Sequence, residues 1–269
     1  MKVGFIGVGN MARAIIAGWQ QQQTVMPKDI YVHSAHKESY QPYAAKLGLN
    51  ACVSNQEVVK QADILFLAIK PIVLKDVLLE IKDVVKQKKP VVVSMVTGVS
   101  LAEIKSVLAS DELEILRIMP NVNVEIAAGM TALVGNDKLS ATNYQKCQEL
   151  LASIGQTVEL PEKDFSTFVA LAGSSPAYVY FYIDAMARTG VKYGLTKKEA
   201  TKISAQAVLG SAKKVLASSK TPMELVDDVC SPGGTTIAGL LAMQEAGFMT
   251  AVVKGIDATI AKDQSVQTK

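Results

Sequence analysis

The chain contains few of the residues that build disulfide frameworks and metal sites. Its 269 residues include 3 cysteines and 2 histidines, and the cysteines lie far apart without a C-x-x-C pair. Such spacing argues against structural disulfides and zinc sites, and it favours a reducing compartment. We therefore expect a cytoplasmic protein that holds no metal.

A surplus of one charge and a long hydrophobic run are also missing. The 28 basic and 25 acidic residues give a formal net charge of +3, too balanced to indicate a nucleic-acid or membrane-surface partner. No segment approaches the ~18 uninterrupted apolar residues of a membrane span. Glycines and Arg13 interrupt the apolar N-terminus, unlike a signal peptide. Hydrophobic residues make up 49% of the chain, enough for an ample core in one large or two modest domains.

The first part of the chain alternates short apolar runs with helical patterns. Runs of Val, Ile and Leu separated by helices are typical of a parallel sheet covered on both faces. The runs are Lys2–Gly7, Ile30–Ser34, Ile64–Ile69, Val91–Met95 and Glu114–Met119, and the helical patterns lie near 10–22, 38–47, 74–86 and 100–109. A last pair of strands, near Thr131–Val134 and Thr157–Leu160 around a helix from Ser140 to Ala152, is expected to close the sheet. Residues 1–161 are therefore predicted to form a doubly wound α/β domain.

After Pro161 the strand pattern stops. Helical patterns follow near 162–172, 176–192, 197–217, 222–229, 235–246 and 249–262, so residues 162–269 are predicted to form a separate, all-helical domain. Capping boxes that begin at Ser100, Thr196 and Thr221 support three of the helix starts. The helix around Ala177–Met186 is apolar or aromatic on nearly every face, which favours burial against a second subunit. A central core helix of a monomer is the alternative.

The clearest motif is the run from Val3 to Ala12, in which an apolar strand leads through glycines into a helix. Gly7 allows the tight turn, Gly9 lets the backbone approach a pyrophosphate, and Ala12 stands where a third small residue packs the helix on the strand. The helix N-terminus would add its dipole. A tight turn without a ligand is the alternative. The pattern is typical of a Rossmann-type dinucleotide site, with candidate cofactor contacts at Ile6, Gly7, Val8, Gly9, Asn10 and Met11.

The segment after the second predicted strand indicates which nicotinamide cofactor would bind. An acidic residue is expected there in a site selective for unphosphorylated ribose, but Val32 to Lys37 contains no carboxylate. A 2′-phosphate would instead meet Ser34, His36 and Lys37, so we expect NADPH, with NADH as a weaker cofactor. Because no arginine is present to grip the phosphate, a polar surface turn stays open as the alternative.

Two further stretches are candidates for cofactor binding. Ala68, Ile69, Lys70 and Pro71 end a buried strand, at the carboxyl edge of the sheet where ligands collect. Asn55 precedes a helical segment, and it would either cap that helix or hydrogen-bond the cofactor.

A second motif, Cys230 to Thr236, joins two predicted helices. Its adjacent glycines permit a bend with exposed N–H groups, the following helix adds its N-terminal dipole, and three hydroxyls lie within reach. These groups suit a small carboxylate. A plain helix–helix turn capped by Ser231 or Thr235 is the alternative. The candidate substrate contacts are Ser231, Gly233, Gly234, Thr235 and Thr236.

The two histidines, His33 and His36, both lie beside the predicted adenosine ribose, so the hydride-transfer centre has no histidine as acid or base. Oxidation of an alcohol normally needs a base. Reduction of a protonated imine needs little more than hydride delivery and a hydrogen-bond partner. C=N reduction is therefore favoured over alcohol oxidation, although a lysine could serve as a base.

With both motifs placed, the chain resembles the Δ1-pyrroline-5-carboxylate reductases nearly from end to end. The likeness rests on Phe5 to Ala12, Ala68 to Pro71, Arg117 to Asn121, Gly129 to Leu133, Leu171 to Tyr178 and above all Ser231 to Thr236. The resemblance implies NADPH-dependent reduction of the C=N bond of L-1-pyrroline-5-carboxylate to L-proline, the last step of proline biosynthesis. It also implies subunits whose helical halves interlock as dimers, which often assemble further into decamers.

The resemblance further implies roles for single residues. It places the substrate carboxylate on the loop from Ser231 to Thr236, and it makes Thr236 the candidate catalytic residue because that hydroxyl would face the ring nitrogen. Ser34, Asn55 and the stretch from Ala68 to Pro71 match cofactor-contacting positions. Departures from the family pattern are Val96-Thr97, Val122-Asn123 and Ser175.

Three other functions stay open. A reductase of a related cyclic imino acid would share these motifs. A β-hydroxyacid dehydrogenase shares the layout but usually carries a lysine on the long helix after a glycine-rich turn, and Gly173 to Ala185 contains none. A non-catalytic dinucleotide-binding sensor or scaffold would have no need for Ser231 to Thr236.

Overall fold

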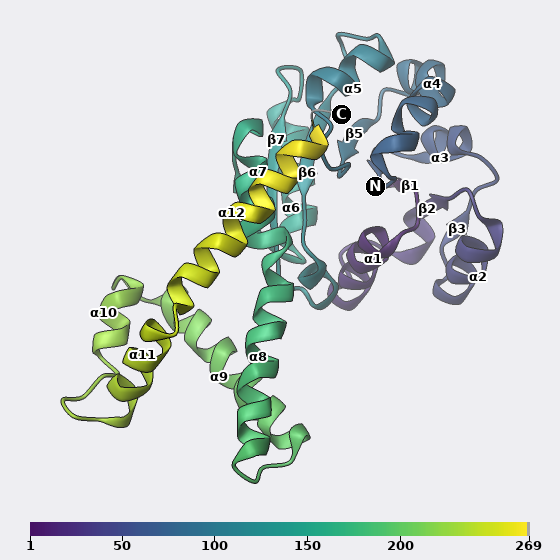
Figure 1. The fold of residues 1–269 in the computed structure, drawn as a ribbon. Coiled ribbons are helices and arrows are strands. Elements are labelled where there is room, and N and C mark those ends of the chain that lie inside the picture. Colours follow the sequence, from purple (N-terminus) through teal and green to yellow (C-terminus); the bar gives the residue numbers. More distant parts are fainter. Residues whose placement is uncertain (268–269) are drawn as a thin grey trace. The chain divides into compact units, whose positions relative to one another are not determined.

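The computed structural model describes residues 1–267, with the side chains of residues 266 and 267 outside the description. The chain divides into two compact units. Met1–Gly173 and the segment from Ile260 onward form the first, and Ser174–Thr259 forms the second. Figure 1 follows the chain through its elements.

The described residues of the first unit contain one eight-stranded sheet with the order β3-β2-β1-β4-β5-β6-β7-β8. Neighbouring strands run parallel except for β6 and β7, which are antiparallel. The strands are β1 (Val3–Ile6), β2 (Ile30–His33), β3 (Asn50–Ala51), β4 (Ile64–Leu67), β5 (Val91–Ser94), β6 (Ile115–Met119), β7 (Gly129–Gly135) and β8 (Gly155–Glu159). The antiparallel pair has a simple cause, because the 3-10 turn η2 (Val122–Ile126) that joins β6 to β7 is shorter than a parallel crossover requires.

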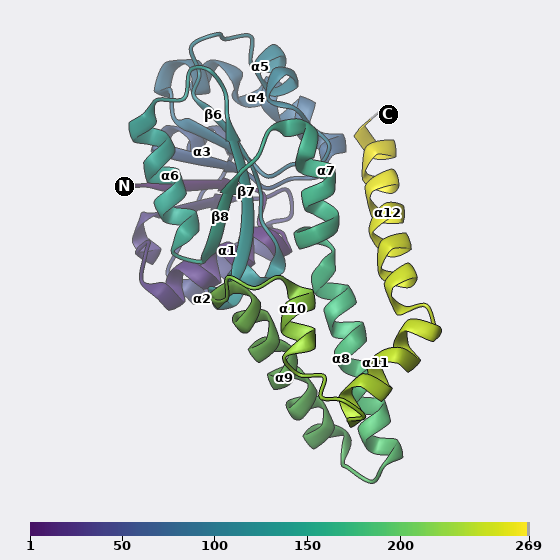
Figure 2. The same cartoon turned by 90° about the vertical axis from the view of Figure 1, so that its left-hand side faces the viewer.

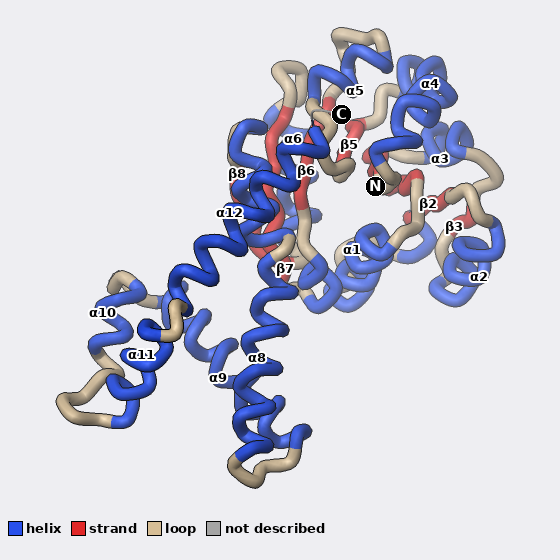
Figure 3. The backbone as a smooth tube through the Cα atoms, in the orientation of Figure 1, coloured by secondary structure: helices blue, strands red, loops and turns tan. Residues whose placement is uncertain are grey.

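Helices cover both faces of this sheet, which confirms the predicted doubly wound fold (Figures 1 and 3). They are α1 (Asn10–Gln22), α2 (Lys37–Leu47), α3 (Asn55–Gln61), α4 (Pro71–Lys88), α5 (Leu101–Leu108), α6 (Ala141–Ala152) and α7 (Phe165–Phe168), with the 3-10 turns η1 (Pro27–Asp29) and η3 (Glu162–Asp164) and the π-helix η4 (Val169–Gly173). Because alternate strand residues point to opposite faces of the sheet, each strand contributes side chains to two hydrophobic cores. Phe5 and Phe66 pack with α1, α2 and α6, whereas Leu65 and Leu67 pack with α3, α4 and α5.

Three aromatic rings form the centre of the first core. Phe5 and Phe66 stack with ring centroids 4.9 Å apart, and Trp19 meets Phe66 edge-on at 5.5 Å. The buried indole Nε1 of Trp19 donates to the Leu150 carbonyl oxygen at 2.8 Å. This contact ties α1 to α6 on the same face of the sheet.

The described residues of the second unit form helices joined by turns, with no strand, which confirms the predicted helical region. Its helices are α8 (Ser175–Lys192), α9 (Lys197–Ala217), α10 (Pro222–Asp227), α11 (Thr235–Glu245) and the first part of α12 (Phe248–Gln267). Complete capping boxes begin α9 at Thr196 and α10 at Thr221. In contrast, α5 shows half of its predicted box, in which the Ser100 hydroxyl accepts from the Glu103 amide.

Helix α8 is not the central core helix of its own unit. Only Pro176 and Ala187 are buried along it, whereas Tyr180 is 57% and Phe181 is 78% exposed. Such a run of exposed aromatic side chains favours a protein partner. The alternative of a monomeric core helix is therefore wrong.

The C-terminal part of α12 belongs to the first unit. There the Ser166 hydroxyl donates to Asp263 Oδ2 at 2.8 Å, and both side chains are buried. Figure 2 shows this end of α12 beside α7. No single helix in the described chain is long and apolar enough to cross a membrane, although α11 and α12, bent by 51°, meet that criterion as a pair.

Candidate active site

The glycine turn between β1 and α1 has room for a diphosphate. Gly7 has a φ of +95°, and its amide donates to the His33 carbonyl oxygen at 2.8 Å. A Cβ on Gly7 would lie 2.3 Å from the Ala68 carbonyl oxygen, so this position must be glycine. A Cβ on Gly9 would have no neighbour within 4 Å, and it would project into open space. Gly9 also caps α1 without a side-chain hydrogen bond, which leaves the first amides of that helix to a ligand.

The other predicted cofactor residues lie around this turn. Ala68 donates its amide to the Ile6 carbonyl oxygen at 2.9 Å, and Lys70 and Pro71 begin α4 at the carboxyl end of β4. The side chains of Ile6 and Val8 are buried, so these two residues can offer a ligand only their backbone. The other predicted cofactor residues here have exposed or half-buried side chains, which a ligand can reach: Asn10, Met11, Ile69, Lys70 and Pro71.

The turn after β2 also carries its predicted residues. Ser34 is half-buried, and His36 and Lys37 are exposed. His36 occupies the N-cap position of α2 without a side-chain cap, and Lys37 is the first residue of that helix. A hydroxyl, an imidazole, an ammonium group and open helix amides therefore share one turn, which suits a phosphate.

Asn55 does not cap α3. The cap is Ser54, whose Oγ accepts from the Glu57 amide at 3.2 Å. Asn55 Oδ1 lies 2.8 Å from His33 Nδ1, and its Nδ2 donates to Glu80 Oε2 at 2.8 Å. The capping interpretation of Asn55 was therefore wrong, and the pattern Ser54-x-x-Glu57 was the signal for the true cap.

Arg13 reaches the β2–α2 region, although the sequence offers no arginine in that turn. Its Nε donates to the Val8 carbonyl oxygen at 3.0 Å, and its Nη2 donates to the Ser39 carbonyl oxygen at 3.1 Å and to Ser39 Oγ at 3.0 Å. A residue four positions after Gly9 thus contributes a positive charge that a search limited to the second strand missed.

A partly buried ion pair connects strand β6 to η3. Arg117 Nη1, on β6, donates to Glu162 Oε1 at 2.6 Å, and the same oxygen accepts from the Leu101 amide at 3.0 Å. The guanidinium of Arg117 also lies over the Phe165 ring, 4.6 Å from its centroid. Through these contacts, the Arg117–Glu162 ion pair connects β6 to the start of α5 and to α7.

The Asn121 side chain fixes the turn that follows β6. Its Nδ2 donates to the Ala172 carbonyl oxygen at 3.0 Å, and its Oδ1 accepts from the Asn123 and Met130 amides at 3.2 and 3.3 Å. Ala172 lies in the π-helix η4, so this hydrogen bond connects the turn after β6 to η4. The departure from the family pattern at Val122-Asn123 therefore leaves the Asn121 contacts in place.

The predicted carboxylate loop lies in the second unit, between α10 and α11. Gly233 has a φ of +67°, and the Gly234 amide donates to the Ser231 carbonyl oxygen at 3.0 Å. Gly234 is the N-cap of α11 and provides no side-chain cap, so the alternative in which Ser231 or Thr235 caps the helix is wrong. The hydroxyls of Ser231, Thr235 and Thr236 are exposed. Open helix amides next to three hydroxyls form a set of hydrogen-bond donors that suits a carboxylate.

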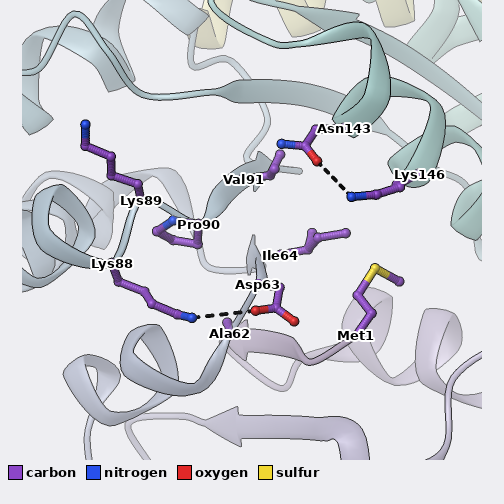
Figure 4. Close-up of a pocket in the computed structure, with 10 residues that line it drawn as sticks. All are labelled: Met1, Ala62, Asp63, Ile64, Lys88, Lys89, Pro90, Val91, Asn143 and Lys146. Carbon is purple, nitrogen blue, oxygen red and sulfur yellow. Dashed lines mark hydrogen bonds and ion pairs between the residues drawn. The ribbon is translucent and has the colours of Figure 1, made fainter.

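A separate hollow of about 400 Å³ opens at the opposite, amino edge of the sheet (Figure 4). Lys88 and Asp63 face each other there at 3.5 Å, and Lys146 Nζ donates to Asn143 Oδ1 at 3.4 Å. None of the predicted site residues lines it.

Two family descriptions match this chain. Residues 162–266 match "Pyrroline-5-carboxylate reductase dimerisation", and residues 2–98 match "NADP oxidoreductase coenzyme F420-dependent". These ranges contain the carboxylate loop and the glycine turn, respectively.

Relatives of known name are similar over nearly the whole chain. The pyrroline-5-carboxylate reductase of Escherichia coli (strain K12) is 37% identical over 265 residues, which is 98% of each chain. The crystal structure of the Streptococcus pyogenes enzyme has a TM-score of 0.88 at 41% identity and covers 98% of each chain. The Plasmodium falciparum pyrroline carboxylate reductase, a structure with NADP bound, has a TM-score of 0.89 at 26% identity and covers 99% of this chain and 98% of that one. Full-length identity at this level, together with both matched halves, places the chain in the pyrroline-5-carboxylate reductase family.

Proposed function

We propose that the protein reduces the C=N bond of L-1-pyrroline-5-carboxylate to give L-proline, with NADPH as the reductant, as the last step of proline biosynthesis. The observation that carries the proposal is the loop from Ser231 to Thr236, where exposed hydroxyls adjoin an uncapped helix N-terminus. A dinucleotide-binding scaffold without a carboxylate substrate has no use for this donor set. The full-length relatives support the same reaction.

The first unit would hold the cofactor. The backbone around Gly7 and Gly9 and the first amides of α1 would bind the diphosphate, and Ser34, His36 and Lys37 would bind the 2′-phosphate. Ala68 to Pro71, together with Asn55, would line the remainder of the cofactor. When bound, NADPH supplies the hydride for the reaction. NADH would bind more weakly because it lacks the group that the β2–α2 turn recognises.

The carboxylate loop would hold the substrate. The Ser231 hydroxyl and the open backbone amides at the start of α11, beginning with Thr235, would bind the carboxylate and so fix the ring, an orienting effect worth up to ~7–11 kcal/mol in the best cases. Thr236 would hydrogen-bond the ring nitrogen and stabilise it as charge changes there. Both histidines of the chain lie near β2, by the proposed adenosine ribose. This scheme therefore assigns no histidine as an acid or base.

We also propose that the subunits pair through the exposed apolar faces of the second unit, with each substrate pocket at the dimer interface. A dimer is the minimum assembly, and a decamer is the larger assembly to test for. The free thiols of Cys52, Cys147 and Cys230 suit the cytoplasm.

The deciding experiment mixes the purified protein with NADPH and pyrroline-5-carboxylate and follows the nicotinamide absorbance. We expect loss of absorbance with this substrate and formation of proline. Hydroxyacids with NADP⁺ and keto acids with NADPH serve as controls. Turnover of a hydroxyacid would support a β-hydroxyacid dehydrogenase instead, turnover of a different cyclic imine alone would change the substrate, and cofactor binding without turnover of any of these would favour a non-catalytic protein.

A further inference from the structure

Arg13 occupies the space between two turns of the candidate cofactor site. Its Nε bonds to the carbonyl oxygen of Val8, the residue after Gly7 in the glycine turn. The Gly7 amide in turn bonds to the carbonyl oxygen of His33, the residue before Ser34. On its other side, Arg13 Nη2 bonds to Ser39 in the first turn of α2. The guanidinium is therefore held beside both the diphosphate turn and the β2–α2 turn.

The position of this guanidinium is fixed before any ligand binds. It lies over the Tyr43 ring, 4.6 Å from the centroid, in addition to its three hydrogen bonds. These contacts use Nε and both hydrogens of Nη2, whereas Nη1 has no hydrogen-bond partner within the described residues. A planar guanidinium held in this way loses little side-chain freedom when it binds an anion.

Among the described residues, Arg13 also has no carboxylate within ion-pair distance. The chain has three arginines. Arg117 and Arg188 form ion pairs with carboxylates at 2.6 and 2.5 Å. Arg13 instead bonds to two carbonyl oxygens and a hydroxyl, which are neutral acceptors. A cation held by neutral groups, with no carboxylate in direct contact, remains able to attract an incoming phosphate.

We propose that Arg13 is a specificity-determining residue, which distinguishes a 2′-phosphate from a 2′-hydroxyl on the adenosine ribose of the cofactor. The inference rests on the proposed use of NADPH, and it adds an arginine to a site for which the sequence indicated only Ser34, His36 and Lys37. The guanidinium supplies a charge-assisted hydrogen bond that NADH cannot form, because a ribose hydroxyl carries no charge.

The test measures binding of two cofactor fragments by isothermal titration calorimetry on the full-length protein. Adenosine 2′,5′-bisphosphate carries the extra phosphate and 5′-AMP does not. In R13M we expect the affinity for the bisphosphate to fall roughly ten- to hundredfold, the value of a hydrogen bond to a charged group. The affinity for 5′-AMP should stay within about twofold. K46M, which removes an exposed charge from the last turn of α2, is the matched control and should leave both affinities unchanged.

Equal loss of both fragments in R13M would overturn the proposal, since Arg13 would then only hold the two turns together. Unchanged affinity for both fragments would overturn it as well. If R13M does not fold, R13K provides the same comparison with the charge kept and the planar geometry lost. A selective, smaller loss for the bisphosphate in R13K supports the proposal, and an equal loss for both fragments contradicts it. Because no step needs turnover, failure of the protein to reduce pyrroline-5-carboxylate would leave this result unaffected.

Discussion

The Gly234 amide donates to the Ser231 carbonyl oxygen at 3.0 Å, and a Cβ on Gly234 would lie 2.5 Å from Ser231 Oγ. The two residues thus define the shape of the proposed carboxylate loop. Any larger residue at position 234 would displace the Ser231 hydroxyl, which takes the space that a methyl group would fill.

Gly234→Ala should therefore impair substrate binding more than cofactor binding. The new methyl group forces the Ser231 hydroxyl to move, and loss of one hydrogen bond to a carboxylate is worth roughly 1.5–3 kcal/mol. We expect the KM for pyrroline-5-carboxylate to rise about tenfold or more, while the Kd for NADPH stays constant. Gly210→Ala, where an added Cβ meets nothing within 4 Å, is the control. An unchanged KM in Gly234→Ala would show that Ser231 does not bind the substrate.

Thr236→Ala should lower turnover without changing cofactor affinity. The Thr236 hydroxyl is exposed at the start of α11, so its loss should not disturb packing. If it hydrogen-bonds the ring nitrogen as charge changes there, we expect kcat to fall about ten- to hundredfold. Steady-state kinetics and NADPH titration would measure the two effects. Thr236→Ser should recover most of the rate, and Thr24→Ala, at an exposed position before β2, should match the unaltered protein. A kcat in Thr236→Ala equal to that of the parent would remove this residue from the mechanism.

Alanine substitutions at Gly7 and Gly9, in the turn between β1 and α1, should have different effects on stability and on cofactor binding. Gly9→Ala meets no protein atom, so we expect a melting temperature close to that of the parent and a strong loss of NADPH binding, because the methyl group occupies the diphosphate space. Gly7→Ala combines a φ of +95° with contact to the Ala68 carbonyl oxygen at 2.3 Å, so it should destabilise the fold itself. Thermal melts and cofactor titrations distinguish the two outcomes. Tight NADPH binding by Gly9→Ala would contradict the proposed diphosphate position.

The three thiols should react at very different rates. Burial raises the pKa of Cys52 to about 11, with a further contribution from Glu57, and burial raises the pKa of Cys147 to about 12. Near neutral pH both therefore stay protonated and unreactive, whereas Cys230 is partly exposed. With a chromogenic disulfide reagent we expect one fast thiol in the native protein and three after unfolding. The fast thiol should be absent from Cys230→Ser, and a second fast thiol in the native protein would contradict the burial of Cys52 or Cys147.

Loss of charge from Glu162 should cost more stability than loss of Arg117. The Arg117 side chain is 5% exposed and Glu162 is 30% exposed, so Glu162→Gln leaves a buried cation without a counter-charge. We expect a loss of roughly 2–4 kcal/mol in the free energy of unfolding. Arg117→Met should cost less, because methionine fills apolar space and Glu162 reaches water. Denaturant titration measures both values. The reverse order would mean that the contact of Arg117 with Phe165 matters more than the charge pair.

Most of the fold could be predicted from the sequence because its strands are continuous apolar runs. The predicted strand at Ile64–Ile69 appears as β4 over Ile64–Leu67, and the helix at 197–217 matches α9 at both ends. The two-residue strand β3 is too short to give a pattern. The π-helix η4 was included in a helical pattern, since an apolar run does not show whether its turns are widened by a residue.

The candidate site was predictable where a single segment contains its residues. The glycine turn and the loop from Ser231 to Thr236 are of this kind, because local backbone requirements select the glycines. The contacts of Arg13 with Ser39 and of Asn55 with Glu80 join residues 26 and 25 positions apart, and such pairings follow from how the helices pack. No local pattern marks them.

The hydrogen bond between Ser166 and Asp263 bears on how this protein can be divided. Because the C-terminal segment returns to the first unit, the helices between Ser174 and Thr259 form an insertion with two covalent attachments, not an appendage with one. A fragment ending at Gly173 would lack Asp263, the carboxylate to which the Ser166 hydroxyl donates. A self-standing cofactor-binding fragment would need Met1–Gly173 together with the segment from Ile260 onward, joined by a linker in place of the inserted helices.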